Sequence, residues 1–355
     1  MDLSQFTSLE AFEWRGVQRN SHLLGLRNCL QACAQTLKSL YLDFLTEGGF
    51  NSEGDLCRVS YDDLLSTQIL GIVNNDRGQL LFPTLESLSF RFGQLGNDLR
   101  YFVPAFPWEQ LHTLKVNECE EGTELMEAVS DAGRTFERLR HFEFMGYDLV
   151  ASHWLPQFLD ACPILENLCV SYHDGNSDDL LPWPANFPIK RLVHHDQLKG
   201  KLELKRSKLL RVLQQTRLEF LGLRFHITPL LALLQSLPLS SRPPLKLLHI
   251  RTEYSDHGYG RSSDIQSEVA RDAAALAEWA FSVDGFSQLE MIIWGDTAYN
   301  FRAKYNKYFV RAHDGPSHGF REIEDVEEVR RFSVVSEFKE MLEACPVMPL
   351  VEAHW

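Results

Sequence analysis

One short phrase recurs along the chain and constrains its fold more than any other feature. It consists of a leucine, two variable residues, an apolar residue, one variable residue and a further apolar residue, as in Leu85, Leu88 and Phe90. Ten copies begin at Leu9, Leu37, Leu85, Leu111, Leu139, Leu165, Ile189, Leu218, Leu245 and Leu289. The copy at Ile189 is weaker, because His194 stands in its last apolar position. Apart from two intervals of 48 and 44 residues, successive copies start 24 to 29 residues apart.

The phrase predicts a stack of short parallel strands. Its fourth and sixth positions alternate with other residues, so their side chains lie on one face of a strand. One such strand cannot bury that face alone, whereas a stack of repeats forms a continuous core. The period matches the ~20–29 residues of a leucine-rich repeat. The sequence therefore predicts an α/β leucine-rich-repeat solenoid, a curved parallel sheet of about ten repeats with helices on its outer face.

The intervals between copies show helical spacing of apolar residues. We expect helices over residues 23–37, 124–131, 154–161 and 227–237. Residues 1–295 would form the solenoid, with insertions at 46–81 and 251–285, each with a helix of its own, near 61–73 and from Ser263. Residues 296–355 would form a C-terminal cap, with a strand-like stretch at 299–309 and helices at 322–329 and 335–342.

Composition narrows the class of protein. The chain has 35 Lys and Arg against 49 Asp and Glu, a net charge of −14, which disfavours general nucleic-acid binding. It has no apolar run of about 18 residues and no basic-then-apolar start, so we expect neither a membrane partner nor a signal peptide. Its seven cysteines form no CxxC pair, and Cys33, Cys162 and Cys345 share a Leu-x-Ala-Cys context. This usage predicts buried thiols and a cytoplasmic or nuclear location.

Catalytic motifs are missing from the sequence. We find no nucleophile elbow, phosphate loop or zinc-protease helix, and we expect a protein that is not an enzyme and has no metal or cofactor. His194 and His195 are adjacent on a strand, so they point to opposite faces and do not easily share a metal. The alternative, a hydrolase, would use His257, Asp314 and His318. The basic run from Lys199 to Arg211 is either a dock for an acidic partner, an import signal or a solvated helix face.

The sheet face opposite the core carries the third, fifth and seventh positions of each phrase, and we call it the inner face. It holds six Lys or Arg against three Asp or Glu, so we expect an acidic protein segment to bind there. The candidate partner-binding residues are Tyr41, Asp43, Arg91, Lys115, His141, Glu143, Arg191, His195, Arg224, His249 and Arg251. Four apolar residues interrupt this face: Phe220, Leu247, Met291 and Ile293. Either the C-terminal segment folds back over them, which we favour, or they form a partner hot spot.

Several phrases together resemble filamentous-fungal F-box/leucine-rich-repeat proteins. They are the segments 158–168, 278–281, 285–289, 294–296 and 341–350. The resemblance implies that the repeats hold a target protein for a cullin-type ubiquitin ligase, with the F-box docked on the ligase linker subunit. No helical Leu-Pro-type F-box precedes the first repeat here, so binding of the linker subunit is expected only if an F-box is restored. The alternative is a free-standing repeat protein that binds and caps a partner enzyme.

Overall fold

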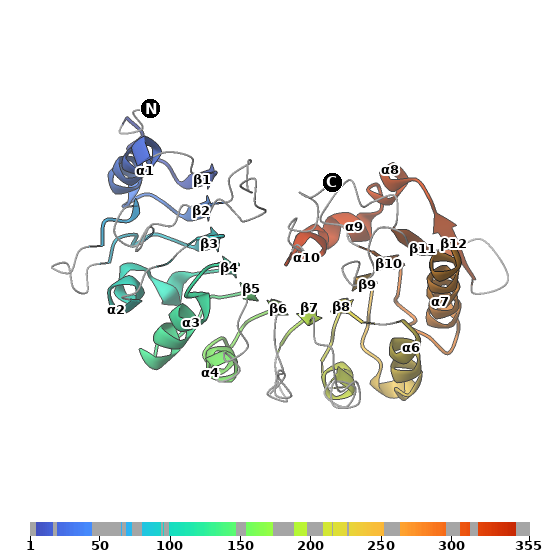
Figure 1. The fold of residues 1–355 in the computed structure, drawn as a ribbon. Helices are drawn as coiled ribbons and strands as arrows, with labels where there is room; N and C mark the ends of the chain where they lie inside the picture. The colour runs from blue at the N-terminus through green and yellow to red at the C-terminus, as the bar shows by residue number, and fades with distance from the viewer. Residues whose placement is uncertain are drawn as a thin grey trace. The chain divides into compact units, whose positions relative to one another are not determined.

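The strands of the protein form a mostly parallel sheet whose spatial order follows the chain from β1 to β12 (Figure 1). The chain divides into two units, one covering Met1–Leu165 and the other Glu166–Ser171 with Gly175–Val351. The predicted boundary at residue 295 lies within the second unit and stays a prediction. The computed structural model describes residues 5–16, 20–44, 65, 69–72, 80–93, 95, 99–146, 154–172, 188–196, 209–214, 216–225, 227–251, 263–295, 306–312 and 319–345.

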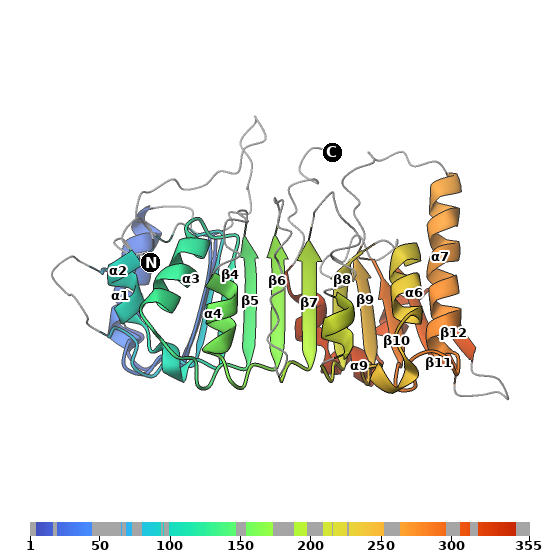
Figure 2. The ribbon, with the colours of Figure 1, turned by 90° about the horizontal axis from the view of Figure 1, so that it is seen from below.

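The first unit places parallel strands side by side. They are β1 (Ala11–Arg15), β2 (Ser39–Asp43), β3 (Ser87–Arg91), β4 (Thr113–Asn117) and β5 (His141–Gly146), and each pairs in parallel with the next. Its helices are α1 (Asn20–Cys33), α2 (Leu99–Phe102), α3 (Gly122–Asp131) and α4 (Trp154–Asp160), with 3-10 turns at Val103–Ala105 and Trp108–Gln110. In Figures 1 and 2 these helices lie on one side of the strands.

The repeated phrase forms the core of the first unit, as predicted. Leu40, Leu88, Leu114 and Phe142 lie in register on neighbouring strands, and all four side chains are fully buried. A second column contains Leu42, Phe90, Val116 and Phe144. Each such buried side chain contributes about 1.5–3 kcal/mol relative to exposure. Neighbouring repeats therefore hold each other in register, because a slip of one residue would turn both columns out of the core.

The second unit begins with parallel strands and ends with an antiparallel pair. Its strands are β6 (Asn167–Tyr172), β7 (Arg191–Asp196), β8 (Phe220–Arg224), β9 (Leu247–Arg251), β10 (Met291–Trp294), β11 (Lys307–Ala312) and β12 (Gly319–Ile323). Pairing is parallel from β7 to β10 and antiparallel from β10 to β12. Its core column contains Leu192, Leu221, Leu248 and Ile292, again in register and buried.

Helices lie on both sides of the strands in the second unit (Figures 1 and 2). On the side of the core are α6 (Ile227–Gln235) and α7 (Ser263–Phe281), with a 3-10 turn at Leu239–Ser241 between them in sequence. The C-terminal helices α8 (Val326–Val329), α9 (Ser333–Glu337) and α10 (Lys339–Glu343) follow β12. Residues of these three helices belong to the cluster of buried side chains on the inner face.

Most expected helices are confirmed, but some bounds differ. The first helix ends at Cys33 rather than at residue 37, and the one expected at 335–342 is two short helices, α9 and α10. The predicted helix at 322–329 begins only at Val326, because Glu322 and Ile323 belong to β12. Ile323 is buried opposite Tyr308, and Glu322 pairs with Lys307 at 2.5 Å. Asp325 then starts α8, since its side chain accepts a hydrogen bond from the backbone N–H of Glu327. Of the helix expected near 61–73 the structure describes only residues 65 and 69–72, and the start of the strand-like stretch at 299–309 lies outside the described residues.

The cysteines behave as small buried side chains in the part of the chain that the structure describes. Each of its six cysteines is buried and free of a disulfide. The thiols of Cys33 and Cys162 each donate to a carbonyl four residues earlier, at 3.0 and 3.1 Å. Burial raises the pKa of Cys33 to about 11, so this thiol is protonated at neutral pH. None of the described helices has the length and hydropathy that a membrane span needs.

Candidate functional site

The inner face of the first unit carries polar side chains in ordered rows. Parallel pairing places Tyr41 beside Ser89, Ser89 beside Lys115, and Lys115 beside Glu143. The next row contains Asp43, Arg91 and Asn117, and His141 lies in the row on the opposite side. This order follows from the period of two in a strand: residues that alternate with the buried leucines point to the opposite face of the sheet. We call seven of these residues the polar cluster: Tyr41, Asp43, Arg91, Lys115, Asn117, His141 and Glu143.

One half of the polar cluster centres on Asp43. The Tyr41 hydroxyl donates to its carboxylate at 3.2 Å, and a guanidinium nitrogen of Arg91 lies 3.8 Å from the same oxygen. The guanidinium of Arg15 lies over the Tyr41 ring, 5.4 Å from its centre. Burial, followed by the nearby Asp43 charge, raises the pKa of Tyr41. The phenol therefore stays a hydrogen-bond donor at neutral pH.

The other half centres on Glu143. Its carboxylate accepts a hydrogen bond from the Asn117 side-chain amide at 2.8 Å and lies 3.3 Å from the Lys115 ammonium. A ring nitrogen of His141 lies 3.7 Å from the same carboxylate. A carboxylate with several such partners is held in one orientation, so it can orient the cations around it in turn.

Depth separates the two signs of charge in this face. The side chains of Asp43 and Glu143 are 9% and 4% exposed, whereas those of Arg91 and Lys115 are 20% and 22% exposed. The carboxylates therefore lie below and the cations reach the solvent. A molecule that approaches the polar cluster first meets the positive charge and N–H donors of Arg91 and Lys115. The arrangement can bind acceptor groups, such as carboxylates or backbone carbonyls.

The inner face of the second unit has a different character. Its predicted site residues Arg191, His195, Arg224, His249 and Arg251 come from β7, β8 and β9. His195, His249 and Arg251 are at most 2% exposed. Register places Arg224 beside Arg251. A role of these residues in partner binding stays a prediction, but the three most buried side chains are covered in this structure.

Arg251 forms the polar centre of this covered region. Its guanidinium donates to the backbone carbonyls of Leu342, Ala344 and Cys345, at the end of α10. It also lies 3.1 Å from Nδ1 of His195. Burial, followed by the Arg251 charge, lowers the pKa of His195 well below its usual value. His195 is therefore neutral and accepts through Nδ1.

His249 is also buried in its neutral form. Its Nε2 donates to the carbonyl of Gly295 at 2.9 Å. Burial and then Arg251 lower the pKa of His249 to about 3. Gly295 itself has a φ of +125°, and a Cβ there would collide with the side chain of Asn306. Glycine is thus required at the point where the chain leaves β10.

The apolar interruption of the inner face is covered by the C-terminal segment. Phe220, Leu247, Met291 and Ile293 form one buried cluster with residues of α8, α9 and α10. The expectation that the end of the chain folds back over these side chains is therefore confirmed. The sequence did not predict the contribution of Arg251, because its partners are main-chain carbonyls more than ninety residues away.

Some predicted features fall outside the described residues. They are His257, Asp314, His318 and the basic run from Lys199 to Lys208. Within the described ranges, no group of three or more His, Cys, Asp or Glu side chains is placed to hold a metal ion. His194 occupies a core register position beside Leu223 and is partly buried, and His195 points to the inner face, as expected for adjacent strand residues.

Comparisons with known proteins give no further guide. No protein-family model matches the chain, and neither a curated protein nor a solved structure matches it.

Proposed function

We propose that the chain is a leucine-rich-repeat solenoid that serves as a protein–protein interaction scaffold. In this role it resembles the substrate-recognition region of an F-box subunit of a cullin-type ubiquitin ligase. The fold supports the proposal, since a stack of strands presents one face of successive repeats to a partner. The single observation that carries it is the polar cluster of the first unit.

The polar cluster suits protein binding because its side chains are already ordered. Binding usually costs about 0.5–1.5 kcal/mol for each long side chain that becomes immobile. Here Asp43 holds Tyr41 and Arg91 in place, and Glu143 does the same for Lys115 and Asn117. Much of that cost is therefore met when the protein folds.

The charges of the face favour an acidic segment as the partner. Within the polar cluster the two carboxylates lie beneath, and Arg91 and Lys115 are the charged groups nearest the solvent. Positive charge at the surface of a protein of net charge −14 is a local feature that would orient an acidic partner during approach. Charge-assisted hydrogen bonds from these two side chains would then fix the segment on the sheet.

A pair of neutralising substitutions tests the proposal. We expect Arg91→Gln with Lys115→Gln to reduce proximity labelling of partner proteins in the native cell by about tenfold, the loss of a few charge-assisted bonds. The matched control is Arg138→Gln with Arg140→Gln, which removes two exposed arginines from the turn before β5. The control should label the same proteins as the unchanged chain.

Two further results decide how far the proposal holds. An unchanged set of labelled proteins in the folded Arg91 and Lys115 double variant would contradict a binding role for the polar cluster, with folding checked by thermal unfolding. The ligase role requires that the linker subunit co-purifies with the tagged chain. If the linker subunit does not co-purify while other partners do, the scaffold acts outside such a ligase.

A further inference from the structure

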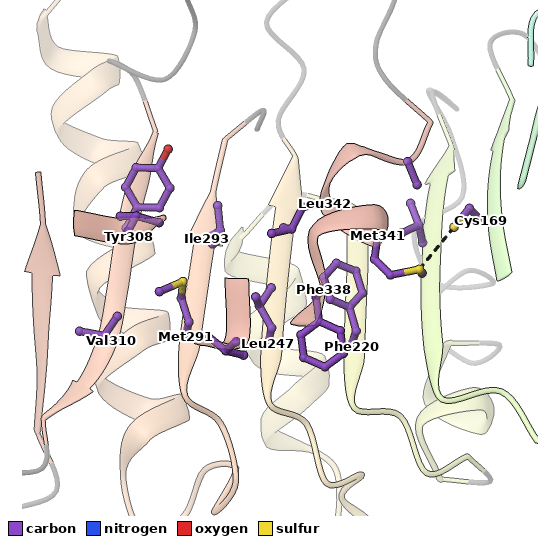
Figure 3. Close-up of a cluster of buried hydrophobic side chains, with 14 of the residues drawn as sticks. Cys169, Phe220, Leu247, Met291, Ile293, Tyr308, Val310, Phe338, Met341 and Leu342 are labelled. Atoms are coloured by element: carbon purple, nitrogen blue, oxygen red, sulfur yellow. Dashed lines mark hydrogen bonds between the residues drawn. The ribbon is translucent and has the colours of Figure 1, made fainter. Parts of the chain in front are cut away.

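The C-terminal helices lie in the inner face of the second unit as a ligand would (Figure 3). The buried side chains Val334, Phe338, Met341 and Leu342 point into the cluster formed with β7, β8, β9 and β10. Their spacing is i, i+4, i+7 and i+8, across the two short helices α9 and α10 that meet at Phe338. This is the pattern with which an amphipathic helix binds in an apolar groove of a partner protein.

Phe338 is the central contact of this segment. Its ring is fully buried, 5.3 Å from the ring of Phe220, and the guanidinium of Arg191 lies 5.1 Å from its centre. Beside it, Met341 places its sulfur 3.8 Å from the thiol of Cys169. The strands thus supply an aromatic contact, a cation over the ring and a sulfur contact, each matched to one side chain of the segment.

The segment has little structure that it could keep on its own. The helices α8, α9 and α10 contain only four or five residues each. Helices this short are not stable in water without tertiary contacts. Docking must therefore supply the free energy that orders the segment, and a competing helix that is already formed would not bear that cost.

Arg251 marks the polar end of the site. It is 1% exposed, and its hydrogen-bond partners among the described residues are the three carbonyls at the end of α10 and neutral His195, none of which carries a charge. A helix C-terminus offers a buried cation only a partial negative charge. A full carboxylate in the same place would form stronger, charge-assisted hydrogen bonds. The neighbouring Arg224 adds a second positive charge on the adjacent strand.

We propose that the inner face of the second unit is a docking site for an amphipathic helix of another protein that ends in a carboxylate-bearing residue. The segment of α9 and α10 occupies this site in the same chain until such a helix displaces it. The proposal concerns the second unit alone and does not depend on the function proposed for the first. The carboxylate of the incoming helix takes the place of the carbonyls that now bind Arg251.

A labelled peptide with the sequence of residues 331–345 provides the probe. It is made with a free C-terminal carboxylate and, as a matched control, with a C-terminal amide. The carboxylate of the first form falls where the Cys345 carbonyl contacts Arg251. Binding is measured by fluorescence anisotropy under reducing conditions, to the full chain and to a Phe338→Ala, Met341→Ala double variant that weakens the resident segment and leaves every strand unchanged.

The proposal predicts two differences in affinity. The peptide binds the double variant at least about tenfold more tightly than the unchanged chain, since the resident segment competes less. The carboxylate form binds at least about fivefold more tightly than the amide, because it pairs with Arg251. Equal affinity of the two chains, or of the two peptides, overturns the proposal.

A second measurement applies if the double variant does not fold. Saturating peptide is then added to the unchanged chain, and hydrogen exchange of residues 333–343 of the protein is followed. Displacement of the resident segment makes these amides exchange faster. Exchange that is unchanged or slower overturns the proposal.

Discussion

Replacing Phe338 by alanine tests how the C-terminal segment is held. The ring is 0% exposed and rests against Phe220, so its removal leaves a cavity between the segment and β8. Phe-to-Ala changes in protein cores cost about 3–5 kcal/mol. Loss of the cation–π contact with Arg191, 5.1 Å from the ring centre, adds about 0.5–1 kcal/mol.

The cost should appear first as local opening, because the affected helices are short and follow the last strand. An opening that is easier by about 3 kcal/mol corresponds to about a hundredfold faster hydrogen exchange. The amides to follow are those of Phe338 and Leu342, which donate to the carbonyls of Val334 and Phe338 at 3.1 and 3.0 Å. The amides of β8 should keep their protection if only the segment opens.

The matched control is Phe6→Ala. The Phe6 side chain is 48% exposed, so its truncation should change the free energy of unfolding by no more than about 0.5–1 kcal/mol. Urea unfolding and hydrogen exchange are measured on both variants. The reasoning is refuted if Phe338→Ala speeds exchange of the two amides less than about fivefold and lowers stability by less than about 1 kcal/mol.

Three further predictions concern single side chains, each measured by chemical or thermal unfolding. Glu143→Gln should lower stability by about 1–3 kcal/mol, because Lys115 and Asn117 lose their buried charged acceptor; a change below about 0.5 kcal/mol would contradict the polar cluster. Gly295→Ala should lower the free energy of unfolding by more than about 2 kcal/mol, because the new Cβ collides with Asn306. The control Gly133→Ala, also at positive φ but with open space around it, should lower it by only about 1 kcal/mol. Equal losses of stability in the two variants would contradict the collision. The pKa of His195 and the pKa of His249 are lowered in the folded protein, so below the ordinary histidine pKa of about 6.5 the unfolded chain binds more protons than the folded one. The free energy of unfolding should therefore decrease from pH 6.5 towards pH 3, by up to about 1.4 kcal/mol per pH unit for each histidine. His249→Gln should reduce this slope, and an unchanged slope would contradict the burial of a neutral His249.

The core of the fold could be predicted because the strand period of two is a local property. Once Leu88, Leu114 and Phe142 are assigned to one strand position, their pairing in register follows from the equal spacing of the phrase. The same rule identified Phe220, Leu247, Met291 and Ile293 as apolar residues on a face that is otherwise polar. Because four apolar side chains on a polar face are unfavourable in water, we could predict that the C-terminal segment covers them.

Other features depend on contacts between distant parts of the chain and could not be predicted. From the sequence, six cations against three carboxylates predicted a basic inner face. In the first unit, however, the carboxylates of Asp43 and Glu143 lie beneath Arg91 and Lys115 and partly neutralise their charge. Likewise, Arg251 binds main-chain carbonyls, which every residue carries, so no side-chain pattern marks its partners. Strand β12 was missed because its buried residue, Ile323, is recognised only through its place opposite Tyr308.

Site-specific photo-crosslinking tests most directly whether the inner face of the first unit binds another protein. A photoreactive phenylalanine derivative replaces Tyr41 in the polar cluster and, as a control, Leu24, whose side chain on α1 is 62% exposed. The account predicts a partner protein crosslinked from position 41 in the native cell, absent from position 24 and lost when Arg91→Gln and Lys115→Gln are added. A partner crosslinked only from position 24, or one retained at position 41 despite both substitutions, would contradict it.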